Sequence, residues 1–114
     1  MKLYGIKNCD TVRKARKWLE KHNIAHEFHD FREQALMQES VAKWCQILGW
    51  ETVFNKRSTS FRGLDEAQKT DLTEQKAIAL MLEHPTLIKR PVLESQSNVM
   101  VGFKDADYQA WFKK

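Results

Sequence analysis

A short apolar run at residues 3–6 is followed within three residues by a basic amphipathic stretch, residues 10–22, with Cys9 at the junction. The run predicts a buried strand. The stretch predicts a helix, because its apolar side chains recur at helical spacing. These apolar side chains are Val12, Ala15 and Leu19. A strand that leads through a tight turn into a helix limits the chain to layered folds that combine sheet and helix.

The middle of the chain predicts mainly helix. A second short strand is expected at residues 27–31, followed by a helix at 39–48 that Gly49 ends. Residues 50–63 are expected to be irregular, with a short helical turn. A further helix, starting at Asp71 or Thr73, should end at Glu83, because the next residue precedes a proline and is disfavoured in the α region.

The end of the chain predicts a hairpin and a helix. A strand is expected at residues 90–94, a turn at 96–98, a return strand at 99–101 and a last helix from Asp105. The whole order is therefore β-α-β, a helical middle, and β-β-α. This order is typical of an α/β or α+β layered domain.

Composition excludes several classes of protein. The 114 residues suit one domain with a modest core. The net charge is +4, and the Lys and Arg residues are interleaved with acidic residues, which is typical of a solvated surface. Two distant cysteines argue against a disulfide framework and fit a reducing compartment. No apolar run is long enough to span a membrane or to serve as a signal peptide. We expect a cytoplasmic monomer that binds neither nucleic acid nor membrane.

The two cysteines have different predicted roles. Cys9 stands at a helix N-terminus, where unpaired backbone N–H groups and the positive end of the helix dipole favour a thiolate, so we interpret it as a nucleophile. The alternative for any single cysteine is a small buried hydrophobe. Cys45 lies on the apolar stripe of helix 39–48, which predicts a buried, inert thiol.

No metal site is expected. His22, His26 and His29 straddle a helix end and a strand and lack a fourth ligand at the spacing of known zinc motifs. Solvated or capping histidines are the simpler interpretation. The four tryptophans are expected in the core or at its rim rather than as platforms for nucleic-acid bases.

Several segments carry a family resemblance. The strand, the turn with a cysteine, the helix and a later proline that opens a hairpin resemble the thioredoxin-like fold. Residues 9–13, Cys-Asp-Thr-Val-Arg, resemble the C-x-T-x-R signature of the ArsC family, and residues 84–92 are similar to its H-P-x-L-I-x-R-P segment. Residues 4–11, 65–69 and 101–104 resemble the YffB branch of that family. The resemblance implies one domain over residues 1–114, with a thioredoxin-like mixed sheet and a helical insertion at roughly 35–88 between the second and third strands.

The resemblance also implies a set of site residues. The family nucleophile falls on Cys9, and two anion-binding arginines fall on Arg57 and Arg90. Guanidinium groups bind anions in a bidentate manner, and the backbone N–H groups of Thr11 and Val12 would add a nest for the same anion. For Arg57, a surface charge on a loop is the alternative. Lys7 is expected to assist, and Lys104 is expected nearby.

Pro91 is expected to follow a cis peptide bond, as the fold resemblance implies. Its role would be to place backbone groups beside the thiol for strand-like pairing with a peptide substrate; the alternative is rigidity. The chain also departs from arsenate reductases, which have a third arginine where Gly102 stands and a histidine where Gly5 stands. Val12 occupies the second position of the C-x-x-C pair of Spx regulators, so any redox cycle must use one thiol.

These features predict a glutathione-dependent thiol reductase with a single nucleophilic cysteine and no bound cofactor. Glutathione would be the co-substrate, and another small thiol, an oxyanion or glutaredoxin would be further partners. One alternative is an arsenate reductase coupled to glutathione and glutaredoxin. Another is a non-catalytic Spx-like regulator that binds RNA polymerase.

Overall fold

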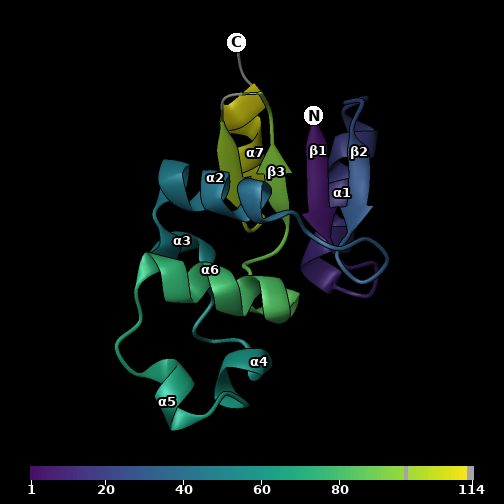
Figure 1. The fold of residues 1–114 in the computed structure, drawn as a ribbon. Helices are drawn as coiled ribbons and strands as arrows, with labels where there is room; N and C mark the ends of the chain where they lie inside the picture. The colour runs from purple at the N-terminus through teal and green to yellow at the C-terminus, as the bar shows by residue number, and fades with distance from the viewer. Residues whose placement is uncertain (97, 113–114) are drawn as a thin grey trace. The chain divides into compact units, whose positions relative to one another are not determined.

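The chain forms two compact units in a computed structural model that describes residues 1–96 and 98–112 (Figure 1). The first unit combines Met1–Gln34 with the segment from Arg90 onward, and the second is Ala35–Lys89. The second unit falls on the segment that was expected to be inserted between the second and third strands. Ser97, in the middle of the expected turn at 96–98, lies outside the described residues.

The first unit contains a four-stranded sheet in the order β2-β1-β3-β4. Its strands are β1 (Lys2–Gly5), β2 (Glu27–Asp30), β3 (Val92–Glu94) and β4 (Val99–Val101). β1 and β2 are parallel, whereas β3 is antiparallel to both β1 and β4. The mixed sheet and the α/β class predicted from the sequence are confirmed.

The strand directions bring one end of each of the four strands to the same edge of this sheet. β3 runs against β1, with Tyr4 opposite Val92, and against β4, with Val92 opposite Val101. The carboxyl ends of β1, β2 and β4 therefore share an edge with the start of β3. In Figure 1 the arrows of β1 and β2 point to that edge and the arrow of β3 points away from it.

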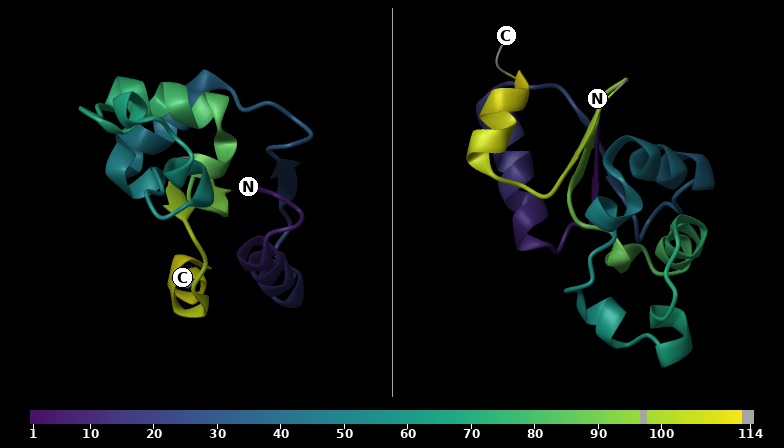
Figure 2. Two further views of the ribbon diagram at one scale, coloured as in Figure 1. Left: turned by 90° about the horizontal axis from the view of Figure 1, so that it is seen from below. Right: turned by 90° about the vertical axis from the view of Figure 1, so that its left-hand side faces the viewer.

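Two helices cover one face of the sheet: α1 (Asp10–Lys21) and α7 (Asp105–Phe112). Both lie on the same side of the strands in the views of Figure 2. Trp18 of α1 meets the ring of Tyr108 edge-on, with centroids 5.4 Å apart, and its indole N–H donates to Asp105. The buried core between sheet and helices consists of Leu3, Ala15, Trp18, Leu19, Leu93 and Tyr108.

The second unit is helical. Its elements are α2 (Gln38–Leu48), α3 (Trp50–Val53), α4 (Thr59–Arg62), α5 (Glu66–Lys69), α6 (Glu74–Glu83) and a 3₁₀ turn (Pro85–Leu87). α2 ends at Gly49, whose φ of 87° lies in the left-handed region that favours glycine. α6 begins after Thr73, whose side chain accepts the N–H of Lys76, and it ends at Glu83 as predicted.

The structure is more helical than predicted between residues 50 and 69. α3 and α4 replace most of the expected irregular segment, and α5 was not anticipated. Each is a four-residue helix, too short to show a period in the sequence, and local caps mark two of them. Ser58 accepts the N–H of Phe61, and Gln68 accepts the N–H of Asp65.

Over residues 1–96 and 98–112, no helix combines the length and the apolar character that crossing a membrane requires.

Candidate functional site

Cys9 lies at the N-cap of α1, in the turn that leaves the carboxyl end of β1. Its backbone is extended (φ −102°, ψ 125°), its carbonyl accepts the N–H of Arg13 at 2.9 Å, and its own N–H donates to the carbonyl of Ile6 at 3.3 Å. Residues 6–9 therefore form a hydrogen-bonded turn. The residue is half-buried, and its backbone is held by hydrogen bonds on both sides.

The first turn of α1 begins directly after Cys9, as the sequence predicted. In an α-helix the N–H groups of the first turn, here including those of Thr11 and Val12, have no carbonyl within the helix to bind. Thr11 is half-buried, whereas the Val12 side chain is fully buried. The positive helix end is partly offset by Asp10, which pairs with Arg13 one turn later.

Lys7 contacts Asp30, the last residue of β2, and Glu33 in the loop that follows. Its ammonium group lies 2.9 Å from Glu33, and its backbone N–H donates to Asp30 at 3.3 Å. The hydrogen bond and the charge of Glu33 raise the pKa of Lys7. The pair is exposed and therefore weak.

Arg90 and Pro91 stand at the start of β3, beside the end of β1 that leads to Cys9. The register that pairs Tyr4 with Val92 brings them there. The Arg90–Pro91 peptide bond is cis, which confirms that prediction, and Arg90 is half-buried. The carbonyl of Pro91 accepts the N–H of Gly102 at 2.9 Å, which ties the end of β4 to the same edge.

Lys104 lies between β4 and α7 and is exposed. Its carbonyl accepts the N–H of Tyr108 at 3.1 Å and so starts α7. Gly102, two residues earlier, has a φ of 79°. The position where arsenate reductases are expected to have an arginine is thus held in a backbone conformation that side chains disfavour.

Arg57 belongs to the second unit, unlike the other predicted site residues. It is exposed, and its backbone N–H donates to the Asn55 side chain at 3.1 Å. It lines a pocket of about 390 Å³ in which cationic side chains outnumber acidic ones. The lining residues are Glu51, Phe54, Asn55, Lys56, Arg57 and Lys89.

The other cysteine is part of the helical core. Cys45 is only 2% exposed on α2. Burial, with a smaller contribution from the charge of Glu74, raises the pKa of its thiol to about 11. Cys45 is therefore protonated at neutral pH and shielded, which fits the inert role expected for it.

The three histidines each contact a backbone carbonyl. The rings lie 2.8 to 3.1 Å from their acceptors, which are the carbonyls of residues 18, 24 and 34 for His22, His26 and His29. These contacts fit capping and surface roles. Within the part of the chain that the structure describes, no three His, Cys, Asp or Glu side chains converge as metal ligands do.

One residue of this sheet edge was missed in the sequence. Asp30 ends β2, and its side chain is buried and bonded to the turn before Cys9. The only signal was an acidic residue inside a predicted strand, where a charge is seldom buried without partners.

Comparison with known proteins identifies the family. A solved structure of the YffB protein superposes with a TM-score of 0.93 at 53% identity, covering 96% of each chain. A protein of Brucella melitensis described as related to arsenate reductase (ArsC) superposes with a TM-score of 0.77 at 44% identity, covering 99% of this chain and 94% of the other. The global transcriptional regulator Spx 2 of Oceanobacillus iheyensis is 29% identical, covering 98% of this chain and 83% of the regulator. The family model of ArsC matches residues 4–111, and the chain belongs to the ArsC family.

Proposed function

We propose that this protein is a glutathione-dependent thiol reductase that uses Cys9 alone as its nucleophile. The observation that carries the proposal is the contrast between the two thiols. Cys9 is half-buried at a helix N-terminus, whereas Cys45 is shielded in a helical core and has a pKa of about 11. With Val12 buried one turn after Cys9, no neighbouring thiol can resolve a disulfide.

The reaction follows from a single thiol. The Cys9 thiolate attacks a disulfide substrate, a Cys9–substrate disulfide forms, and the departing thiolate takes a proton from water. A glutathione thiolate then attacks the Cys9 sulfur, which releases the second substrate thiolate and leaves glutathione bound to Cys9 through a disulfide. A second glutathione thiolate attacks the sulfur of the bound glutathione, which frees the Cys9 thiolate and forms glutathione disulfide. The substrate disulfide gains two electrons, which two glutathione molecules supply.

The charged groups around the thiol suit this co-substrate. Glutathione carries two carboxylates, and the free N–H groups of α1 together with Arg90 offer donors for an anion at the sheet edge. Lys7 can exchange Glu33 for a ligand carboxylate, since the existing pair is exposed.

Intact-mass measurement tests the proposal. Reduced protein is incubated with glutathione disulfide, and we expect one glutathione per chain, located on Cys9 by peptide mapping. The Cys45→Ser variant should form the same adduct, and Cys9→Ser should form none. An unmodified parent protein, or an adduct on Cys45, would contradict the proposal.

Arsenate reduction is the weaker enzymatic candidate, because the backbone of Gly102 is unfavourable for the third arginine. The similarity to Spx 2 over nearly the whole chain favours a second, non-enzymatic candidate, a transcriptional regulator that contacts RNA polymerase. Polymerase captured from lysate equally by the parent and by Cys9→Ser would support regulation. Capture by neither protein would count against regulation.

A further inference from the structure

Asp30 is the only charged residue that is buried in the described parts of the chain, with 6% of its surface exposed. Burial of a carboxylate is costly unless its oxygens accept hydrogen bonds. Here both oxygens do: Oδ2 accepts the N–H of Lys7 at 3.3 Å, and Oδ1 accepts the N–H of Arg32 at 2.8 Å. Packing alone does not account for a carboxylate buried at this position.

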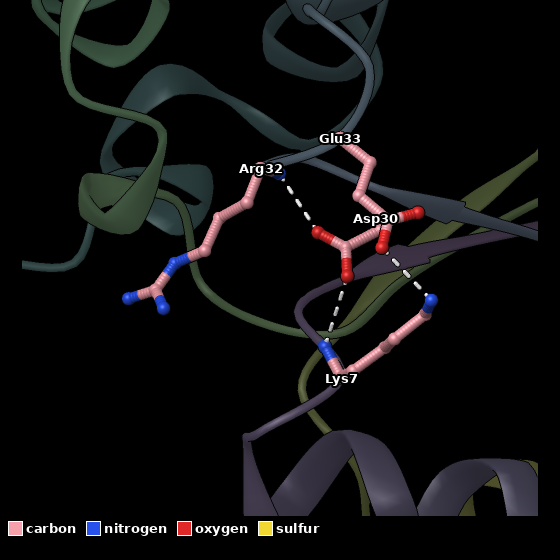
Figure 3. A network of polar contacts seen from close by, with 4 residues as sticks. All are labelled: Lys7, Asp30, Arg32 and Glu33. Carbon is pink, nitrogen blue, oxygen red and sulfur yellow. Dashed lines mark hydrogen bonds and ion pairs between the residues drawn. The ribbon is translucent and has the colours of Figure 1, made fainter.

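The two bonds join two loops. Figure 3 shows the Asp30 carboxylate between the backbone nitrogens of Lys7 and Arg32, with the Arg32 side chain pointing away from it. Lys7 follows β1 and Arg32 follows β2, two parallel neighbours whose carboxyl ends meet at the sheet edge. The carboxylate thus links the turn before Cys9 to the loop after β2.

The loop after β2 is itself held by Asp30. The Asp30 carbonyl accepts the N–H groups of Glu33 and Gln34 at 3.1 and 3.0 Å. The adjacent N–H of Phe31 donates to the carbonyl of Gly5 at 2.9 Å, which continues the strand pairing up to this point. The backbone around Asp30 is therefore held by hydrogen bonds, and this places the carboxylate as an acceptor for the N–H of Lys7.

Lys7 is the second residue of the turn at 6–9, which the bond from the Cys9 N–H to the Ile6 carbonyl closes. An acceptor on the Lys7 N–H restricts the orientation of the peptide that enters this turn. The conformation of this turn determines the position of Cys9 relative to the free N–H groups of α1. We propose that Asp30 is a positioning residue for Cys9, which acts through the backbone of Lys7 and without contact with the thiol.

The inference rests on Cys9 being the reacting group, as proposed above, but it does not require glutathione chemistry. The rate at which iodoacetamide alkylates Cys9, read on the Cys9 peptide, reports the thiol directly. A parent protein that forms no glutathione adduct would overturn the proposed function alone, because the effect of Asp30 on alkylation would still be measurable.

The test variant is Asp30→Asn, which keeps the shape of the side chain but leaves one oxygen to accept two N–H groups. Amide hydrogen exchange at Lys7 or Arg32 should quicken by about tenfold or more, as expected for loss of a bond to a charged acceptor. Alkylation of Cys9 at pH 7 should slow by about threefold or more as its placement loosens.

Asp105→Asn is the matched control. Asp105 accepts from Trp18 and Gln109 in the same unit, so the same substitution removes a carboxylate that holds the far half of α1. Trp18 is nine residues beyond Cys9, about 13 Å along a helix. This variant should lose stability, measured by urea unfolding, and still alkylate at the parental rate.

Parental alkylation by Asp30→Asn would overturn the inference, as would equal slowing in Asp105→Asn. If Asp30→Asn does not fold, the parent protein provides the decisive measurement. Its Lys7 and Arg32 amides must be protected from exchange, and unprotected amides would overturn the inference without any variant.

Discussion

Gly5 at the end of β1 packs closely against the Val12 side chain of α1. A β-carbon built on Gly5 would lie 2.7 Å from Cγ2 of Val12, a non-bonded distance that real β-carbons essentially never show. Val12 is fully buried, and its branched carbons are attached next to the backbone, so they cannot swing aside. The first turn of α1, which presents Cys9, therefore approaches the strand closely because residue 5 has no side chain.

Gly5→Ala should destabilise the protein by about 1–3 kcal/mol, the usual cost of overpacking a filled core. Urea unfolding followed by circular dichroism measures it. Gly5→His, which would install the histidine expected in arsenate reductases, should cost more because the imidazole needs further space.

A double-mutant cycle isolates the contact. Val12→Ala removes the two methyl groups that Gly5→Ala would meet, so the double variant should be more stable than the sum of the single changes predicts. Gly63→Ala is the control: its φ is −81°, and a β-carbon there would meet only atoms at 3.6 Å or more. Equal costs at residues 5 and 63 would contradict the steric explanation.

Gly102→Arg should not convert the protein into an efficient arsenate reductase. The φ of 79° at this position costs a side-chain-bearing residue about 1–2 kcal/mol, although the space around it is open. We expect a lower unfolding midpoint and no gain in glutathione- and glutaredoxin-coupled arsenate turnover.

The Gly102→Asn variant separates the effect of backbone strain from that of the arginine charge, since asparagine tolerates the left-handed region better than other side chains do. It should retain more stability than Gly102→Arg or Gly102→Ala. A stable Gly102→Arg protein with raised arsenate turnover would show that the missing arginine had been the limiting feature.

Stability should fall in mild alkali because of Cys45. In the unfolded chain this thiol ionises near its ordinary pKa of 9.0, whereas in the folded protein its pKa is about 11. Between these values the unfolded state has lost a proton that the folded state still holds, so the free energy of unfolding decreases as pH rises. The slope from this one site is at most about 1.4 kcal/mol per pH unit.

Urea titrations between pH 8 and pH 10 measure that slope, below the range in which Tyr108 adds a similar effect. The Cys45→Ala variant will be less stable throughout, since it leaves a cavity, but its stability should vary less with pH. An unchanged slope in Cys45→Ala would assign the alkaline loss to other groups.

Tyr108→Phe should stabilise the protein. Tyr108 is fully buried, its hydroxyl has no hydrogen-bond partner among residues 1–96 and 98–112, and burial raises its pKa. Removing a buried, unpaired hydroxyl should gain about 1 kcal/mol in the free energy of unfolding. Tyr4→Phe is the comparison, because the Tyr4 hydroxyl donates to Glu94 at 3.3 Å and its loss should be neutral or unfavourable.

Long elements with a clear hydrophobic period were predictable. The helix after Cys9 buries Val12, Ala15 and Leu19, and the helix that contains Cys45 buries that cysteine, as the spacing predicted. The helices α3, α4 and α5 were not predictable, because four residues contain about one turn and show no hydrophobic period. Their ends depend on single caps such as Ser58, whose partner is a backbone N–H.

The candidate site was predictable where it is local in sequence. The N-cap position of Cys9 and the free N–H groups of Thr11 and Val12 follow from where α1 begins. The cis bond before Pro91 came from the family resemblance, as did the choice of Arg57 and Arg90 among many cations. Asp30 was missed, because its partner, the backbone of Lys7, is 23 residues away and leaves no mark in the sequence.

The sequence by itself determined which residue is the candidate nucleophile: a cysteine at a helix N-terminus, with no second thiol one turn later, while the other cysteine lies on an apolar stripe. Tertiary structure decided how that thiol is held. Parallel pairing of β1 with β2 brings Asp30 to the Lys7 turn, and close packing matches Gly5 to Val12. Such contacts form between different elements. Hydrophobic periodicity describes one element at a time and therefore does not predict them.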